Sequence, residues 1–300
     1  MCEVETGVQI LQRISSRLVS DVKCLDPSLF PNGGPNKGEM VEIVGESNCG
    51  KSCLILELIA KIILPVDCGG QALGAVFINC DNNINMIRLL DVMEKQTVNC
   101  SLPATRTVET QEIHDIRQKS LARLTIITCF TLDEFELTML TLSDIFIKNP
   151  INVYLLIDSI VAFYWSKCTE KTLIRMDTYL KSLHTRLKKL CQERKVITIY
   201  TQPAYFGSGR ESGLGEFVGS TDGQTMVSEM PSTLGASSSF AATAGSSNFS
   251  LPIEHRIELA EVNSQTPSDD EQKFNAFVYS KGTPLIKFYM IDKYGINWLN

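Results

Sequence analysis

The sequence predicts a single α/β domain, built on a mainly parallel, twisted sheet that is flanked by helices, with one long disordered loop. Two observations lead to this prediction. Strand-like apolar runs alternate with helical patterns from residue 40 to residue 202, and a parallel sheet needs such crossover helices. The stretch 207–250 then holds eleven Ser and eight Gly, too polar a composition to form a packed element.

The elements expected before residue 202 follow from their apolar patterns. Residues 40–44 form a short apolar run that ends at Gly45, and residues 153–157 form an uninterrupted run, typical of a strand covered on both faces. Residues 52–63 are strongly apolar, and Pro65 ends the helix that they predict. The other expected strands span 75–78, 124–128 and 196–201, and the other expected helices span 8–20, 85–94, 132–147 and 175–194.

The chain is expected to divide into four segments of one domain. Residues 1–37 supply the first helix and a lead-in without a separate helical lobe, and 38–206 supply the α/β core. Residues 207–252 form a disordered insertion, because a Ser/Gly-rich stretch buries too little apolar area to offset its ordering entropy. Strand-like runs resume at 256–261, 274–279 and 286–291, so 253–300 return to the same core.

Charge and cysteine content exclude several classes of protein. The 28 Lys and Arg against 34 Asp and Glu leave a net charge of −6, which excludes a protein that coats nucleic acid non-specifically. The start of the chain is not a secretory signal, and the apolar runs are too short and too charged to span a bilayer, so no membrane partner is expected. The ten cysteines form no CxxC pair, which argues against zinc and fits reduced thiols in the nucleus or cytoplasm.

The motif that carries the chemistry lies between the first strand and the first helix of the core. It reads Gly45, Glu46, Ser47, Asn48, Cys49, Gly50, Lys51 and Ser52, a complete GxxxxGK[ST] phosphate-binding loop. Its glycines let backbone N–H groups converge on phosphate oxygens, Lys51 would reach the β- and γ-phosphates of ATP, and Ser52 would hold Mg²⁺. The alternative is a loop that keeps this shape and binds no nucleotide.

A second ligand for the magnesium ion is expected at the end of a later strand. Asp158 follows directly on the apolar run 153–157 and would hold Mg²⁺ through water. Such an aspartate could merely cap the next turn, but the phosphate-binding loop far upstream makes an ATP-type site the working hypothesis.

Six segments resemble the RecA-type recombinases, in the order in which that family has them. They lie at 38–44, 64–70, 77–81, 156–159, 201–202 and 288–296, and span most of the chain. Two further segments, 157–165 and 87–90, resemble the recombinase paralogues of eukaryotic homologous recombination. The resemblance implies a RecA-like P-loop ATPase fold, ATP and Mg²⁺ as ligands, and a place in DNA repair in the nucleus.

The resemblance also gives roles to two residues outside the phosphate-binding loop. Asp81 stands where active recombinases have the glutamate that activates water, and Gln202 stands where they have the nucleotide sensor. The aspartate is one methylene shorter, which moves the base by about 1.5 Å, and a shift of that size can cost on the order of 100-fold in rate. Asn79 also replaces an aspartate of the family. Asp81 is therefore expected to be a weakened general base, with slow or absent ATP hydrolysis.

Partner binding is the expected role. Forty-four residues precede Gly45, and residues 1–45 contain no F-x-x-A, the motif by which family members dock on a neighbour. The resemblance then implies an adaptor that accepts a neighbour's linker, occupies the terminal position of a hetero-oligomer of recombinase paralogues, and meets DNA through that complex. The insertion 207–252 has Arg210 as its only cation, which argues against tight DNA binding by the chain alone.

Two other functions compete with this one. The first is a catalytically active, DNA-stimulated ATPase that performs strand exchange, and Asp81 counts against it. The second is a P-loop scaffold or signalling ATPase unrelated to DNA, which the recombinase-like segments disfavour. Loss of repair function in a Lys51→Ala variant would favour the active ATPase over the adaptor.

Overall fold

The computed structural model describes most of the core and parts of the segments around it. The described residues are 6–9, 11, 22–82, 84–100, 110–171, 173–204, 253–262, 273–281 and 284–299. Residues 7–9 and 11 are helical, but most of the helix expected at 8–20 lies outside the described residues. The insertion expected at 207–252 lies entirely outside them.

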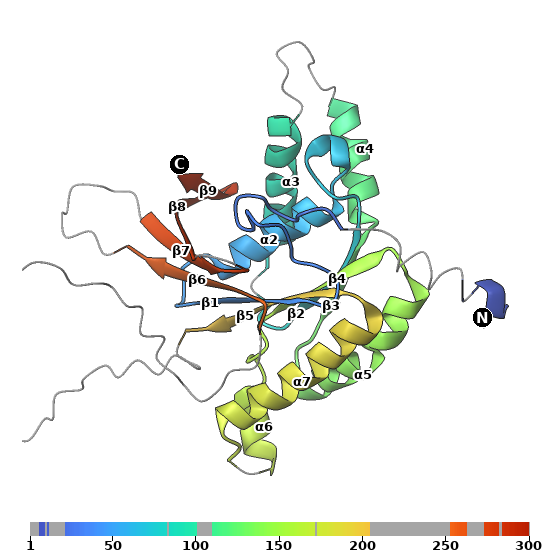
Figure 1. Ribbon diagram of the computed structural model, residues 1–300, viewed down its shortest axis with the longest axis vertical. Helices are drawn as coiled ribbons and strands as arrows, with labels where there is room; N and C mark the ends of the chain where they lie inside the picture. The colour runs from blue at the N-terminus through green and yellow to red at the C-terminus, as the bar shows by residue number, and fades with distance from the viewer. Residues whose placement is uncertain are drawn as a thin grey trace, which may run out of the picture.

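One nine-stranded sheet organises the described part of the chain (Figure 1). The strands span Met40–Gly45 (β1), Gly74–Asn79 (β2), Leu124–Thr128 (β3), Asn152–Asp158 (β4), Ile197–Pro203 (β5), His255–Glu261 (β6), Lys273–Tyr279 (β7), Leu285–Asp292 (β8) and Gly295–Leu299 (β9). Their order is β3-β2-β4-β5-β1-β6-β7-β8-β9, parallel from β3 to β6 and antiparallel from β6 onward. The strands after the insertion therefore continue the sheet that β1 begins.

Helices cover both faces of the parallel half of the sheet (Figure 1). They span Lys51–Ile63 (α2), Met86–Cys100 (α3), Thr110–Leu121 (α4), Leu132–Lys148 (α5), Tyr164–Lys171 (α6) and Met176–Arg194 (α7), with a 3-10 turn at Val66–Cys68 (η1). The first three helices lie on one face, and α5 and α7 lie on the other. The predicted fold class, a mainly parallel sheet flanked by helices, is confirmed.

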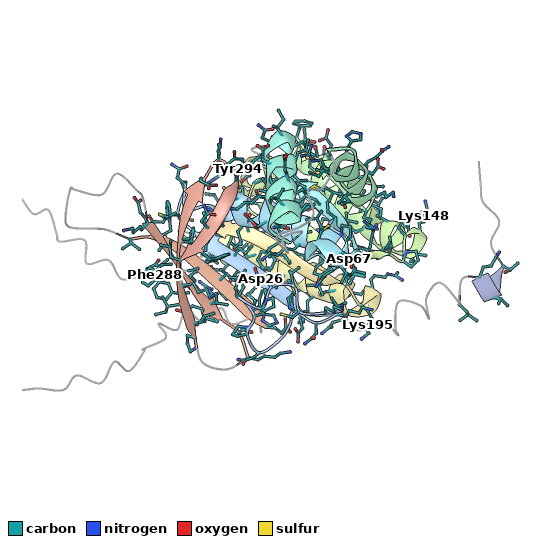
Figure 2. The ribbon with its side chains drawn as sticks, turned by 90° about the horizontal axis from the view of Figure 1, so that it is seen from above. Asp26, Asp67, Lys148, Lys195, Phe288 and Tyr294 are labelled. Carbon is teal, nitrogen blue, oxygen red and sulfur yellow. The ribbon has the colours of Figure 1, made fainter. Side chains whose placement is uncertain are left out.

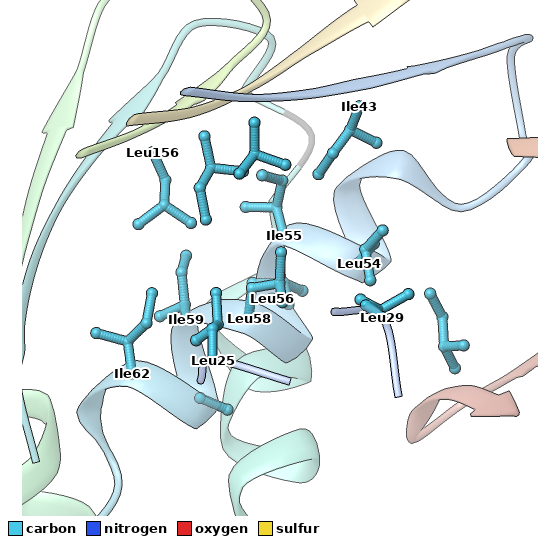
Figure 3. Close-up of a cluster of buried hydrophobic side chains, with 14 of the residues drawn as sticks. Leu25, Leu29, Ile43, Leu54, Ile55, Leu56, Leu58, Ile59, Ile62 and Leu156 are labelled. Carbon is cyan, nitrogen blue, oxygen red and sulfur yellow. The ribbon is translucent and has the colours of Figure 1, made fainter. Parts of the chain in front are cut away.

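Two apolar clusters, one on each face of the sheet, hold these layers together. On the first face, Ile55 of α2 packs with Ile43 of β1 and Leu156 of β4 (Figure 3). On the second face, Phe135 of α5 packs with Ile157 of β4 in the same cluster as the apolar side of α7. Full burial of a side chain of this size contributes roughly 1.5–3 kcal/mol, so these clusters are the main source of stability.

The residues before β1 fold back onto the first cluster. Leu25 and Leu29 are buried beside α2 (Figure 3), and Phe30 is buried next to them. The carboxylate of Asp26 forms an ion pair with Lys61 of α2. The described part of the lead-in is thus a component of this chain's own core.

The antiparallel strands extend the sheet beyond the helices. Figure 2 shows Phe288 of β8 on the side of the molecule away from Lys148 and Lys195, which lie at the ends of α5 and α7. The last strand returns to α2, where the buried Glu57 carboxylate accepts a hydrogen bond from the Ile296 N–H at 3.1 Å. The antiparallel strands are therefore anchored to the helix that follows the phosphate-binding loop.

Two helices were not predicted from the sequence. α4 carries few apolar residues among many polar ones, and α6 is only eight residues long, so neither shows a clear helical period. α3 also runs to Cys100, well past the predicted end at residue 94. Among the described helices, none combines the length and apolar character needed to cross a bilayer.

Candidate nucleotide-binding site

A tight turn carries the chain from β1 into α2. A Cβ atom on Gly45 would lie 2.4 Å from the Sγ of Cys49, so only glycine fits where the loop closes on itself. Asn48 and Gly50 have φ angles of 66° and 89°, in the left-handed region that favours glycine and tolerates asparagine. A side chain at Gly50 would also come within 2.7 Å of Ile291 on β8. The motif's glycines therefore allow a compact loop that lies close against other parts of the chain.

The start of α2 offers donors to an anion. Its N-cap residue, Gly50, has no side chain to accept hydrogen bonds from the N–H groups of the first turn, and that turn contains no acidic residue. Free N–H groups and the positive end of the helix dipole attract phosphate at such a position. The ammonium of Lys51 donates hydrogen bonds to the carbonyl oxygens of Gly45, at 2.9 Å, and Glu46, at 2.6 Å. The lysine side chain thus lies along the loop.

The hydroxyl of Ser52 and the carboxylate of Asp158 lie in direct contact. Ser52 Oγ donates to Asp158 Oδ2 at 2.8 Å, and the hydroxyl of Thr201 on β5 donates to Oδ1. Asp158 is buried at the carboxyl end of β4, beside the start of α2. Oxygen donors of this kind suit Mg²⁺. No cluster of three or more His, Cys, Asp or Glu fit for a metal occurs among the described residues, so a magnesium ion here would also need phosphate and water oxygens.

Asp81 lies at the carboxyl end of β2, on the same edge of the sheet. Its main-chain N–H donates to the carbonyl oxygen of Asp158 at 3.1 Å, and its side chain is exposed. Partial desolvation of the carboxyl group at the pocket wall, together with the charge of Asp158, raises the pKa of Asp81, while Lys51 acts in the opposite direction. Asn79 has a structural contact instead, since its Oδ1 accepts the N–H of Asn82 at 3.1 Å.

These groups surround one pocket of about 570 Å³. Its lining comprises Ser47, Asn48, Gly50, Lys51, Ser52, Cys53, Asp81, Arg88, Asp158, Ser159, Pro203 and Ile291. A pocket of this size takes a small organic molecule, and its cationic, hydroxyl and carboxylate groups suit a metal-bound polyphosphate. Gly45, Glu46 and Cys49 do not line it, and Cys49 is buried with its Sγ 2.9 Å from the Glu46 carbonyl oxygen.

Gln202, the predicted sensor, faces away from this pocket. Its amide Nε2 donates to Glu42 Oε1 of β1 at 2.7 Å, and Arg256 of β6 donates to Glu42 Oε2 at 3.0 Å. The Oε1 atom of Gln202 is buried and has no hydrogen-bond partner among the described residues. Burial raises the pKa of Glu42, although the charge of Arg256 opposes that shift. The structure therefore attaches Gln202 to β1 and does not bring it together with the other predicted site residues.

Among the pocket residues to which sequence analysis gave no role, Arg88 and Ile291 come from elements far from the phosphate-binding loop in sequence. Arg88 comes from α3, and its Nη2 donates to the carbonyl oxygen of Asp292 at 2.9 Å. Its Nε has no hydrogen-bond partner among the described residues. Ile291 of β8 contributes an apolar wall. Arg88 lay in a segment that resembled the recombinase paralogues, and this was the one signal that could have drawn attention to it.

The fold and the loop together define the class of this protein. A parallel sheet with a GxxxxGK[ST] turn at the end of β1 and an aspartate at the end of β4 is a RecA-like α/β domain. The chain belongs to the Rad51 family, whose family model matches residues 16–207. The resemblance to RecA-type recombinases is thereby confirmed.

Two curated proteins are similar to this chain. DNA repair protein XRCC2 of Mus musculus is 26% identical over 214 residues, which cover 70% of this chain and 72% of that protein. DNA repair protein rhp57 of Schizosaccharomyces pombe is 39% identical over 72 residues, 24% of this chain and 20% of that protein. Among the recombinase paralogues, segments 157–165 and 87–90 resemble the second X-ray repair cross-complementing protein, and the similarity to XRCC2 confirms that resemblance.

Proposed function

We propose that this chain is a DNA repair protein of homologous recombination, a recombinase paralogue that works in the nucleus as the terminal adaptor subunit of a paralogue complex. Rad51 family membership supports this role, and both similar proteins are named as DNA repair proteins. In this proposal the complex promotes the recombinase on damaged DNA, and the chain meets DNA through its partners. The observation that carries the proposal is an open, apolar edge of the sheet at β3.

The edge strand β3 is the surface that would accept a partner. In the described part of the chain it pairs with β2 alone, so its other side presents unpaired backbone groups. Ile126 on β3 and Phe130 just after it are 39% and 68% exposed. Extended segments bind such edges by adding a strand, and exposed apolar side chains give them pockets or ridges to pack on.

The lead-in supports the terminal position. Leu29 and Phe30 are buried in this chain's own core, and Asp26 is paired with Lys61. These residues are therefore not available as a linker for a neighbour. A subunit that accepts a strand at β3 and offers none from its described lead-in ends a row of subunits.

The pocket supports weak or structural ATP binding. Lys51 and the start of α2 would hold the phosphates, and Ser52 with Asp158 would hold Mg²⁺ directly and through water. A bound Mg²⁺ would neutralise phosphate charge. Lys51 would have to exchange its two carbonyl contacts for phosphate oxygens. The residues present thus fit the magnesium nucleotide by charge and by donor type.

Slow or absent hydrolysis follows from the groups around that pocket. Asp81 is shorter than the glutamate it replaces, and no side-chain hydrogen bond to another described residue orients it. Gln202 is bonded to Glu42 and does not line the pocket. We therefore expect Asp81 to be a poorly oriented base and Gln202 to make no contact with the nucleotide in this arrangement.

The adaptor role is tested by comparing two variants of the full chain in cells that lack it. Ile126→Asp should disrupt the paralogue complex and abolish recombinational repair, because it puts a charge into the proposed strand-addition surface. Ile286→Asp is the matched control, since Ile286 on β8 is also exposed, at 54%, and lies at the other end of the sheet. Co-purification of partner subunits and survival after DNA damage are the readouts.

The competing role, an active recombinase, predicts a different pattern. Lys51→Ala should leave repair nearly intact for an adaptor, but should abolish repair and DNA-stimulated phosphate release for an enzyme. A repair-deficient Lys51→Ala chain that still assembles with its partners would overturn the adaptor proposal. So would an Ile126→Asp chain that assembles and repairs normally.

A further inference from the structure

Two cysteines lie side by side at the carboxyl ends of β2 and β3. Asn79 and Thr128 are register partners in these parallel strands, and Cys80 and Cys129 follow them directly. The Cys129 N–H donates to the Asn79 carbonyl oxygen at 3.0 Å, so the pairing continues past the strand ends. Paired strands lie roughly 4.7–4.9 Å apart. That separation falls within the Cα span of roughly 4.4–6.8 Å that a disulfide bond requires.

The two thiols lie inside one apolar cluster. Cys80 and Cys129 are 5% and 0% exposed, and both pack in the cluster between the sheet and α5 and α7. The Thr138 hydroxyl of α5 lies 3.5 Å from the sulfur of Cys129. The neighbouring Cys80 thiol lowers the pKa of Cys129, and the Cys129 thiol in turn raises the pKa of Cys80, so the two groups act on each other as a pair. Cys129 is therefore the thiol of the pair that loses its proton first, and the thiolate is the nucleophile of disulfide exchange.

We propose that Cys80 and Cys129 form a redox-active dithiol that closes into a disulfide between β2 and β3 when a low-molecular-weight disulfide oxidises it. The Cys129 thiolate attacks one sulfur of the small disulfide and expels one small thiolate. The Cys80 thiolate then attacks the Cys129 sulfur of the mixed disulfide and expels the second small thiolate. The protein loses two electrons and two thiol protons, and the small disulfide becomes two thiols. Transient opening of the strand ends admits the oxidant.

The pair is connected to the nucleotide pocket through the main chain. The N–H groups of Cys80 and Asp81 both donate to the carbonyl oxygen of Asp158, at 2.7 Å and 3.1 Å. Asp81 and Asp158 line the pocket, and Cys80 directly precedes Asp81. A disulfide bond that draws Cys80 toward β3 therefore changes the position of Asp81 relative to Asp158. The consequence for nucleotide binding rests on the proposed function, whereas formation of the disulfide does not.

The disulfide is tested on the reduced full chain. The chain is incubated with oxidised glutathione, free thiols are blocked with N-ethylmaleimide, and an unreduced protease digest is analysed by mass spectrometry. We expect two peptides linked by a disulfide between Cys80 and Cys129, with a mass two hydrogens below their sum. Dithiothreitol should separate these two peptides. Cys129→Ser should abolish this pair, and the matched control Cys168→Ser, which removes a half-buried thiol of α6, should retain it. Glutathione on Cys24 or Cys53 with Cys80 and Cys129 still reduced would overturn the proposal.

The link to the pocket has its own readouts. Amide hydrogen exchange at residues 80–82 should change at least tenfold on oxidation, and affinity for a fluorescent ATP analogue should fall several-fold. Cys129→Ser should respond in neither assay. Unchanged exchange and affinity in a chain that holds the disulfide would overturn the link. A reduced chain that binds no nucleotide would contradict the proposed ATP site, while the peptide and exchange results would still decide this proposal.

Discussion

The hydroxyl of Tyr289 on β8 donates a 2.6 Å hydrogen bond to the carbonyl oxygen of Cys49 in the phosphate-binding loop. Both residues are buried, and the Tyr289 ring stacks on Phe274 with centroids 5.3 Å apart. The antiparallel strands thus contact the phosphate-binding loop directly, through Tyr289 of β8. This contact joins two parts of the chain that are 240 residues apart in sequence.

Tyr289→Phe should weaken both the fold and the loop. It leaves the Cys49 carbonyl buried without its partner, which costs about 1–3 kcal/mol. Urea denaturation should show a lower midpoint with an unchanged slope, and a fluorescent ATP titration should show weaker binding. Tyr294→Phe is the control, because Tyr294 is 43% exposed and far from the loop contact. Equal stability of the two variants would show that the hydroxyl contact contributes nothing.

Arg88→Ala should reduce affinity for ATP and ADP. A hydrogen bond to a charged group contributes about 1.5–3 kcal/mol, which corresponds to a loss of roughly 10- to 100-fold in affinity. The comparison is with Arg117→Ala, because Arg117 is paired with Glu94 outside the pocket. Isothermal titration of the two variants measures the difference. Normal affinity of Arg88→Ala would exclude a contact between this side chain and the nucleotide.

Removal of magnesium should weaken ATP binding on the order of tenfold, because Ser52 and Asp158 would then face the phosphates without the cation between them. In Asp158→Asn the affinity should no longer respond to EDTA. Asp67→Asn, an exposed change on η1, should respond as the unaltered chain does. An EDTA response retained by Asp158→Asn would remove Asp158 from the magnesium site.

Glu39 should give the fold a measurable acid sensitivity. Burial raises its pKa, but hydrogen bonds from Lys281, the Asn36 N–H and His255 outweigh burial and lower the pKa from 4.5 to about 2. A lowered pKa stabilises the folded state above pH 4.5, and this stabilisation is lost as the pH falls through about 2. We expect Glu39→Gln to lower the free energy of unfolding by on the order of 1–3 kcal/mol at pH 7.

Denaturation at pH 7, 4 and 2.5 checks this prediction. The difference in the free energy of unfolding between Glu39→Gln and the unaltered chain should become smaller at each step toward lower pH. Glu193→Gln should change little at any pH, because the pair of Glu193 with Lys189 on α7 is solvent-exposed. A difference in the free energy of unfolding that is constant with pH would show that folding does not lower the pKa of Glu39.

The sequence predicted the parallel strands because they are covered on both faces. β1 and β4 read as uninterrupted apolar runs, and the structure places them within a residue or two of the predicted bounds. Ser52 and Asp158 could also be expected to meet, since the carboxyl ends of parallel strands converge on one edge of the sheet. The sequence motif and the strand topology were sufficient to predict these features.

Other features depend on tertiary packing that no local pattern encodes. Arg88 enters the pocket because α3 packs on α2, and Ile291 enters it because β8 folds back over Gly50. Gln202 has the expected place at the end of β5, but its direction is set by Glu42 on the neighbouring strand. The polar α4 is stabilised as a helix by its contact with α3, so its own composition gave little sign of it.

The contacts of Tyr289 and Ile291 with the phosphate-binding loop have a consequence for synthesis and for mutation. β8 leaves the ribosome long after the loop it supports, so a nascent chain cannot complete this pocket until its closing strands have been made. A nonsense mutation just after β7 would leave the GxxxxGK[ST] motif, Asp81 and Asp158 in the product. Such an allele would retain every nucleotide-binding motif. Its product would nevertheless lack Ile291, which forms one wall of the pocket, and Tyr289, which bonds to the phosphate-binding loop.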